Sequence, residues 1–566
     1  MDNDFQVQEW EVWHTYSTYL DCPGVDLLEG AINLVKSEVA ECVVSSTGRA
    51  FWQSDGTVAQ GTFTVEVDDE TGQGSFRCDS EDKSSKLPTG FALEAMGQAA
   101  QFVLAERRVL GEGISFADES IRAYLGKVVV VGVDGGRSTA ELNLYPVLVG
   151  YQSGVLVLQL RMIGPPDSIP LSDFINYAVN TPRIRLTKAL VNPGLARAAT
   201  AAYYRSSRVP FFARFGLSWS QFLHNLAVEQ RTTEVADEDF SFRLSPWSGE
   251  TDSFRSIALS IFHTCAYLVA GPRSGLSFLL RGPKVPPSLG QFWSGRPHVH
   301  IIRFRDQRET ASENNKVHAD EFYSILSRTP NLARTLPKNL RLFEDYSAFV
   351  SSSSSLWVWS KQGLKREADR RDPNRGNFIY ERQMLMELLE YGYMLHRGLY
   401  HRVENLQSTD QVMEVRRYLL ELRLRMRESS HSGEIRELLE AGWDALGLPT
   451  LISEIDAGLA LRESEMRSAD TMRTTRVGWV IAIVFGIVAI PGLADQVVTP
   501  AWHALKLHPV IDTDKMKLLS AGIATGVILM LLTAVLWLIS RRNRPRLIES
   551  LKFCRSGSGG ERERAT

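Results

Sequence analysis

Short apolar runs bounded by turn residues mark the first third of the chain, and such runs predict β-strands. The clearest runs have glycine-rich turns between them, as expected for antiparallel hairpins. They are 128–131, 139–149 and 155–162. Weaker runs occur earlier, at 41–46, 49–53, 62–66 and 74–78. The alanine-rich stretch Phe91–Arg108 lies between the two groups and predicts a helix.

The middle of the chain combines helical and extended patterns. The stretch from 166 to about 230 is expected to be largely helical. A proline-rich break follows at 282–297. Beyond it, strands are predicted at Val299–Arg303 and Leu356–Trp359, on either side of a helix at Ala319–Arg328.

Apolar residues recur at helical spacing from Asn377 onward, and again over Gln411–Glu428. A last helix is predicted to begin near Thr450 and meets no proline until Pro491. Its portion Leu451–Arg476 is interpreted as a stalk that continues into an apolar segment.

Two strongly apolar segments follow, Val477–Val498 and Leu518–Ile539, and neither holds a charged residue before Asp495. A hydrocarbon core of about 30 Å needs about 20 apolar helical residues to cross it. Both segments are therefore predicted to be transmembrane helices, with the lipid bilayer as a partner.

Basic residues flanking these segments predict their orientation. They lie mainly outside the pair of segments, at Arg467, Arg473, Arg476, Arg541, Arg542, Arg544, Arg546 and Lys552. In the connection between the segments, lysines are balanced by aspartates. The expected location is the cell (inner) membrane, as a multi-pass protein with both termini in the cytoplasm.

The expected fold class is thus α/β cytoplasmic domains followed by long helices, a stalk helix and two C-terminal transmembrane helices. The expected divisions are an N-terminal mixed α/β domain at 1–165, a second α/β region at 166–376, a helical region at 377–449, the stalk helix at 450–476, a two-span membrane domain at 477–546 and a polar tail at 547–566.

Composition narrows the function. The 566 residues carry a net charge of -3, which excludes a global basic field for nucleic acid, so no nucleic-acid partner is expected. The five cysteines are scattered without a CxxC pair, which suits a reducing compartment. The sequence holds no P-loop, HExxH or GxSxG motif, so neither an enzyme nor a cofactor or metal site is expected.

The order of cytoplasmic domain, helices, stalk helix and two closely spaced C-terminal spans resembles the CorA-type divalent-cation channel family. The resemblance covers about 377–546 and implies a pentamer, or another homo-oligomer, that transports magnesium or related divalent cations. That family carries Gly-Met-Asn after its first span, whereas this chain has Gly492, Leu493 and Ala494 there. Magnesium is usually held through its water shell by oxygen ligands, which an alanine does not offer. Asp495 or Gln496 would have to supply a replacement ring at the pore mouth.

A helical period selects the residues of the first apolar segment that would line or close a pore. These are Thr474, Ile481, Phe485, Val488, Gly492, Asp495 and Gln496. Small residues favour the alternative of helix packing. They are Gly478, Ala482, Gly486, Gly522 and Gly526.

Two further features have alternative interpretations. His298 and His300 are two residues apart on a predicted strand, so both side chains point to the same side. They are interpreted either as a pair of metal ligands or as part of a surface strand. The predicted helix Gln411–Glu428 contains five arginines. They are interpreted either as a solvated helix face or as a site for a phosphate-bearing ligand.

Two functions from different classes remain open at this stage. The first is a CorA-like oligomeric channel or transporter for divalent cations, gated by its large cytoplasmic domain. The second is a membrane-anchored cytoplasmic sensor or effector, such as a ligand-gated defence or signalling protein that binds a cytosolic small molecule.

Overall fold

The computed structural model of this chain divides into two compact units, Met1–Arg462 (unit 1) and Glu463–Thr566 (unit 2). The residues that it describes are 5–20, 26–67, 74–81, 86–110, 118–134, 137–138, 141–164, 167–181, 185–192, 194–195, 197–198, 231–236, 239–242, 254–269, 293–330, 332, 334–369, 376–406, 408–428, 433–493, 522, 526 and 530. Unit 1 contains the sheet.

The centre of the sheet is β1 (Gln6–Tyr19), which the sequence-based expectations do not include. It pairs antiparallel with β10 (Val155–Ile163) on one edge and with β15 (Trp293–Phe304) on the other. Strands from both of the α/β regions expected from the sequence therefore share one sheet. Its central strand comes from the very start of the described chain.

From β1 the sheet extends in two directions through the described strands. On the β15 side it continues to β17 (Ser355–Trp359), which is parallel to β15, and then to β16 (Tyr346–Val350). On the β10 side it continues through β9 (Leu142–Tyr151), β6 (Ser120–Tyr124), β2 (Cys42–Ser45), β3 (Arg49–Ser54), β4 (Thr57–Val67) and β5 (Gly74–Ser80). A branch leaves β9 through β7 (Val128–Asp134), β12 (Arg185–Val191), β14 (Asp239–Phe242) and β13 (Arg231–Ala236). The short strands β8 (Arg137–Ser138) and β11 (Ile169–Pro170) pair with β7 and β1.

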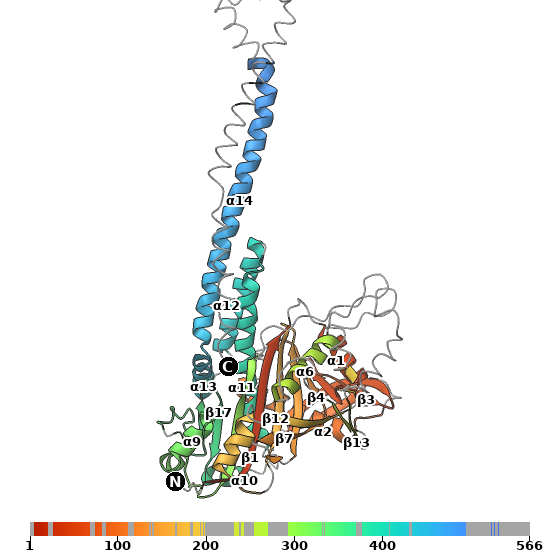
Figure 1. The fold of residues 1–566 in the computed structure, drawn as a ribbon, viewed down its shortest axis with the longest axis vertical. Coiled ribbons are helices and arrows are strands. Elements are labelled where there is room, and N and C mark those ends of the chain that lie inside the picture. The colour runs from red at the N-terminus through yellow and green to blue at the C-terminus, as the bar shows by residue number, and fades with distance from the viewer. Residues whose placement is uncertain are drawn as a thin grey trace, which may run out of the picture. The chain divides into compact units, whose positions relative to one another are not determined.

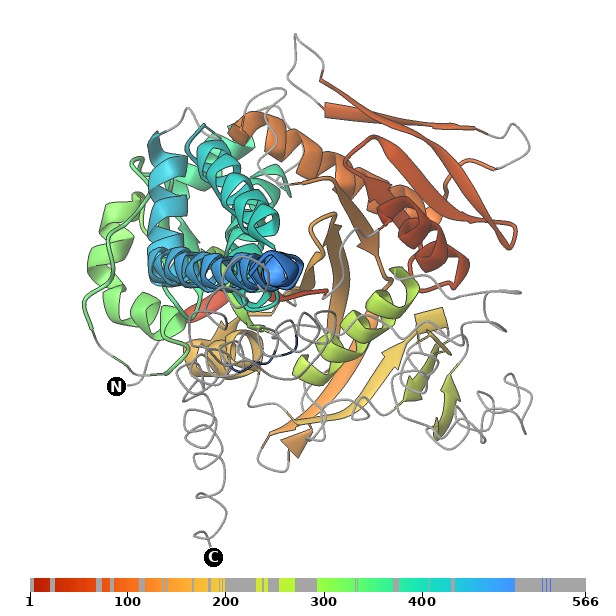
Figure 2. The same ribbon diagram turned by 90° about the horizontal axis from the view of Figure 1, so that it is seen from above.

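Helices cover both faces of the sheet (Figures 1 and 2). In chain order they are α1 (Leu27–Lys36), α2 (Gly90–Leu110), α3 (Leu171–Asp173) with the π-helix η1 (Phe174–Val179), α6 (Phe254–Val269), α8 (Ala311–Val317), α9 (Ala319–Leu326), α10 (Lys361–Asp369), α11 (Gly376–Val403), α12 (Thr409–Glu428), α13 (Gly433–Ala445) and α14 (Leu448–Leu493). Local chemistry sets several of their starts. In α8, for example, Thr310 and Glu313 form a capping box that satisfies the first free N–H groups.

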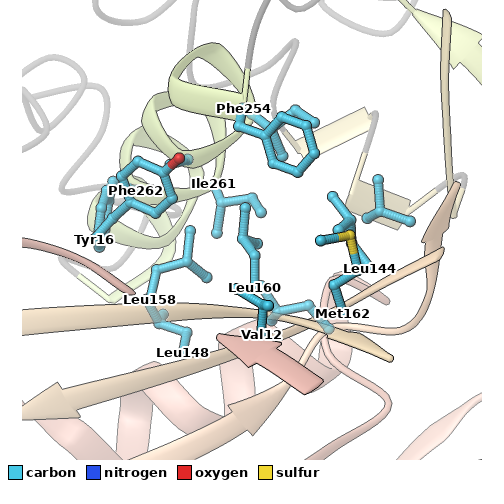
Figure 3. Packing of buried hydrophobic residues seen from close by; sticks show 14 of the residues in the cluster. Val12, Tyr16, Leu144, Leu148, Leu158, Leu160, Met162, Phe254, Ile261 and Phe262 are labelled. Atoms are coloured by element: carbon cyan, nitrogen blue, oxygen red, sulfur yellow. The ribbon is translucent and has the colours of Figure 1, made fainter. Parts of the chain in front are cut away.

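One face of the sheet is apolar and packs against α6. Successive side chains of a strand point to opposite faces, so Val12 of β1 and Leu158 and Leu160 of β10 share this face. Phe254 and Phe262 of α6 lie over them, as Figure 3 shows. All five side chains are at least 98% buried, and this packing forms the main core of unit 1.

The opposite face is buried but polar, and it packs against α11. The alternate residues of β1 and β10 supply Glu11, Thr15, Gln159 and the partly buried Arg161, and β15 supplies Arg296, which is an unusual set for a protein interior. We call this face of the sheet, together with the side chains of α11 that contact it, the polar layer. Buried polar groups are tolerated only when they are paired, so the contacts of this layer are specific.

Some expectations for unit 1 are wrong in detail. The stretch from 166 to about 230 was expected to be largely helical, but 185–191 forms β12, paired with β7. Residues 199–230 lie outside the described residues. The break expected at 282–297 ends earlier, because β15 begins at Trp293. In both places pairing with a distant strand overrides the local pattern.

The helix expected over Leu451–Arg476 is confirmed as part of α14, which continues without interruption to Leu493. The expectation of two C-terminal transmembrane helices is wrong for the described residues, since none of their helices is long and apolar enough to cross a membrane.

The same finding contradicts the expected location in the cell (inner) membrane as a multi-pass protein. The end of the first apolar segment, 494–498, lies outside the described residues. So does the second segment, Leu518–Ile539, apart from Gly522, Gly526 and Met530.

Candidate functional site

Helix α11 places a polar stripe against the sheet. Gln383, Glu387 and Glu390 are spaced at four and three residues, so they share one helix face. All three are at least 96% buried. A buried carboxylate is costly unless a cation and hydrogen bonds stabilise it, so the partners of these acids define the site.

Glu387 is held by four hydrogen bonds from three strands. Nη2 of Arg122 on β6 donates to both carboxylate oxygens, at 2.7 and 2.9 Å. The Tyr151 hydroxyl on β9 donates at 2.9 Å, and Nε2 of Gln159 on β10 donates at 2.8 Å. Burial and the Glu387 carboxylate raise the pKa of Tyr151, which keeps this phenol protonated and donating.

Arg122 is fixed from two sides. Its guanidinium lies over the ring of Phe102 from α2, with Cζ 3.8 Å from the ring centroid. Burial alone would lower the pKa of Arg122, but the nearby Glu387, Tyr124 and Tyr151 outweigh it and the pKa is raised. The Nη1 atom is buried and has no hydrogen-bond partner among the described residues. The N–H groups of Nη1 therefore have no acceptor among the described residues.

A pocket opens beside this ion pair, between β2, β6, β9, α2 and α11, and it encloses about 640 Å³ including the solvent at its mouth. Its polar lining consists of Ser45, Ser46, Glu106, Asp118, Ser120, Arg122, Tyr151 and Glu387. Its apolar lining consists of Val44, Ala99, Phe102, Val103, Met384 and Leu388. Most of the residues in this lining are polar, which suits a small polar ligand. We call this pocket the polar pocket.

Glu106 of α2 is an acid of the polar pocket whose pKa is raised. Burial raises its pKa, and the neighbouring Glu387 carboxylate raises it further, although Arg122 and Arg107 act in the opposite direction. No hydrogen bond to its carboxylate joins it to another described residue. Glu106 thus favours a partner that brings a positive charge or a donor.

Asp118 connects the polar pocket to two helices. The hydroxyls of Tyr391 on α11 and Tyr418 on α12 both donate to its Oδ2, at 2.9 and 3.1 Å. Three carboxylates, Glu106, Asp118 and Glu387, therefore line the pocket together with the single guanidinium of Arg122. This excess of acids attracts a cation.

The polar layer continues away from the pocket as further ion pairs. Arg296 of β15 donates to Glu390 at 2.9 Å, with both side chains almost fully buried. Arg161 of β10 donates to both oxygens of Glu11 on β1, at 2.7 and 3.1 Å. The Arg296–Glu390 pair joins β15 to α11, and Arg161 reaches α11 through a hydrogen bond of 3.3 Å to the Tyr380 hydroxyl.

His298 and His300 lie in this layer, and the surface-strand interpretation of them is wrong. They are 0% and 1% exposed, side by side on β15. His298 Nδ1 lies 2.6 Å from Ser355 Oγ, and the His300 ring stacks on Trp357 at 4.8 Å. Among the described residues, no group of three or more ligating side chains is placed to hold a metal ion.

None of the pore and packing residues expected from the sequence is among the residues that line this pocket. Thr474, Gly478 and Ile481 are exposed on α14, whose backbone also includes Ala482, Phe485, Gly486, Val488 and Gly492. Gly522 and Gly526 are exposed, and Asp495 and Gln496 lie outside the described residues. The pore and packing roles stay predictions.

The polar pocket was missed because its residues are scattered over the sequence, from Val44 to Leu388. One signal was available. Glu387 and Glu390 interrupt an otherwise apolar run that includes Leu385, Leu388 and Leu389, and acids at such positions indicate buried pairing. Their partners are not visible in the sequence.

Comparison of the chain with protein-family profiles, with curated proteins and with solved structures finds no match in any of the three. The geometry of the site therefore carries the functional argument on its own.

Proposed function

We propose that this protein is a ligand-responsive sensor whose polar pocket binds a small amine-bearing molecule. The excess of carboxylates over guanidinium groups around the pocket is the observation that carries the proposal. An ammonium group would lie between Glu106 and Asp118, since Glu387 is already saturated by its own hydrogen bonds. The serine hydroxyls of the lining would accept or donate to polar groups of the same ligand.

Two contacts support a route from the pocket to the C-terminal helices of unit 1. Tyr391 and Tyr418 share Asp118, so a ligand that attracts this carboxylate acts on α11 and α12 together. Leu389 of α11 packs so closely on Gly442 of α13 that a Cβ there would lie 2.5 Å from it. Gly447, with φ +71°, then makes the turn into α14. A small shift of α11 would thus reach α14.

This proposal keeps the sensor alternative of the sequence-based reading and leaves out its membrane anchor, which the structure contradicts. The CorA-like resemblance, the transport of divalent cations and the pentameric state stay predictions. The proposed role is binding and relay, without a chemical reaction.

The proposal predicts that Glu106→Gln weakens amine binding by about tenfold or more, because the ammonium loses a charge-assisted hydrogen bond. Binding is measured by calorimetry with a panel of small amines, including amino alcohols and short polyamines. The matched control is Glu94→Gln, which removes an exposed acid from the same helix and should leave the affinity unchanged.

The raised pKa of Glu106 gives this binding a pH signature. A bound cation favours the ionised carboxylate, so binding releases a proton and the affinity increases as the pH rises through the pKa of Glu106. Calorimetry in buffers of different ionisation enthalpy should detect the release, and Glu106→Gln should abolish it. Equal weak binding of every amine by the wild type and both variants contradicts the proposed function.

A further inference from the structure

Helix α12 has apolar residues on two opposite faces. Val412, Leu419 and Leu422 are buried against unit 1. Met413, Leu420 and Leu424 lie on the other side, and they are 57%, 58% and 47% exposed. A surface helix ordinarily presents polar residues to water on its outer face, so this second stripe is the pattern of a helix with a further partner.

The outer stripe has the spacing of a coiled-coil seam. Met413 and Leu420 are seven residues apart and occupy d positions of a heptad, and Leu424 follows at an a position. The charges beside the stripe follow the same heptad. Glu414 and Glu421 occupy e positions, and Arg416 and Arg423 occupy g positions. One flank of the seam is therefore acidic and the other basic.

We propose that α12 pairs with α12 of a second copy of this chain, in parallel and in register. In a parallel pair each g residue lies opposite the e residue of the next heptad on the other helix. Arg416 then lies opposite the partner's Glu421, and the same contact repeats on the other side of the seam. In an antiparallel pair the acidic flanks of the two helices would face each other, and so would the two basic flanks. Repulsion between like charges therefore disfavours that orientation.

The intrachain contacts of these residues are compatible with the pairing. Arg417 donates to Glu421 at 3.0 Å, and Arg423 donates to Asp456 of α14 at 2.9 Å. These ion pairs are exposed, so they contribute little and are readily exchanged. Between Met413 and Leu424, Arg417 occupies the a position, where a charged residue costs stability but fixes register and strand number. The seam is short, and the expected association is weak and depends on concentration.

The first test is the oligomeric state of the full-length protein by sedimentation velocity over a range of concentrations. The wild type should self-associate, and Leu420→Asp should raise the dissociation constant by about tenfold or more, because it places two carboxylates in the seam. Leu87→Asp, which changes a residue that is 61% exposed elsewhere in unit 1, should have no effect. A monomeric wild type at every concentration, or equal loss in both variants, overturns the proposal.

The second test examines the orientation. Arg416→Glu and Glu421→Arg should each weaken self-association, and an equimolar mixture of the two variants should recover it as a heterodimer with both charge contacts restored. Leu420→Cys should form a disulfide-linked dimer under mild oxidation, because equivalent d positions face each other only in a parallel pair in register. The wild type with its five natural cysteines is the control.

An antiparallel pair would give the opposite pattern, with stronger association in Glu421→Arg and no Leu420→Cys dimer, and would refute the stated orientation. Circular dichroism of each variant should show unchanged helix content, which separates loss of pairing from loss of folding. The seam does not line the polar pocket, so this proposal and the proposed function succeed or fail independently.

Discussion

Replacement of Arg296 by methionine is expected to lower the free energy of unfolding by about 3–5 kcal/mol, the largest effect of any single change proposed for this protein. Arg296 and Glu390 are 2% and 0% exposed and are joined at 2.9 Å. Loss of the guanidinium leaves Glu390 as a buried charge without its cation. It also leaves the Ser351 carbonyl, which accepts from Nη1 at 2.9 Å, without that donor. Urea unfolding followed by circular dichroism measures the change.

The double variant Arg296→Met with Glu390→Leu should recover most of this loss, because an apolar pair of similar volume needs no charge compensation. The matched control lies on the same strand. Arg303 pairs with Glu9 at 3.1 Å, but both side chains are exposed, so Arg303→Met should cost less than about 1 kcal/mol. A loss in Arg296→Met no larger than in Arg303→Met would show that the polar layer does not hold α11 in place.

The second large effect is loss of stability in mild acid. Burial is the main cause that lowers the pKa values of His14 and His300 to about 3. Arg328 contributes for His14, and Arg382 and Arg161 contribute for His300. The pKa of His298 is held well below its usual value by burial, by Arg296 and by the two other histidines. These three imidazoles stay neutral in the folded protein at pH values at which the unfolded chain protonates them.

The direction of this pH dependence follows from the number of protons bound by the folded and unfolded states. Below pH 6.5, the reference pKa of these histidines, the unfolded state binds protons that the folded state does not, so the free energy of unfolding falls as the pH falls towards 3. Each histidine contributes about 1.4 kcal/mol per pH unit in this window, or about 4 kcal/mol per unit for the three. Between about pH 7.5 and 5.5 the unfolded imidazoles are only partly protonated, so unfolding measured over this range should show a total loss of about 4 kcal/mol for the three histidines.

His300→Phe isolates one member of the group. It keeps a flat ring against Trp357 and removes an Nε2 atom without a partner among the described residues, so the pH dependence should decrease by about one proton. Trp357→Phe is the control, because it weakens the same stacking and lowers stability at every pH without removing a titrating group. An unchanged slope in His300→Phe would refute the assignment.

Local patterns in the sequence were sufficient for the elements whose packing is simple. The apolar runs at 128–131 and 155–162 correctly predict β7 and β10, because short runs of β-branched and other apolar residues between turns favour strands. Helical spacing likewise predicts α11, α12 and the course of α14 through Arg476, since these helices have apolar residues at intervals of three and four.

Local hydropathy was not sufficient for the last hundred residues. It measures apolar length along the chain, and on that measure Val477–Val498 is long enough to cross a bilayer. The structure ends the described helix at Leu493 and shows no membrane-spanning helix among the residues that it describes.

The sequence by itself determined that the chain forms a mixed α/β body followed by a long continuous helix, because alternation and helical periodicity are local properties. Only the tertiary structure decided that β1 is the central strand, since its inner face carries polar residues such as Glu11 and Thr15 that resemble a surface pattern until α11 covers them. It also decided which residues meet at the polar pocket. Arg122 and Glu387 are 265 residues apart in sequence, and their pairing depends on which strands become neighbours beneath α11, which no local pattern encodes.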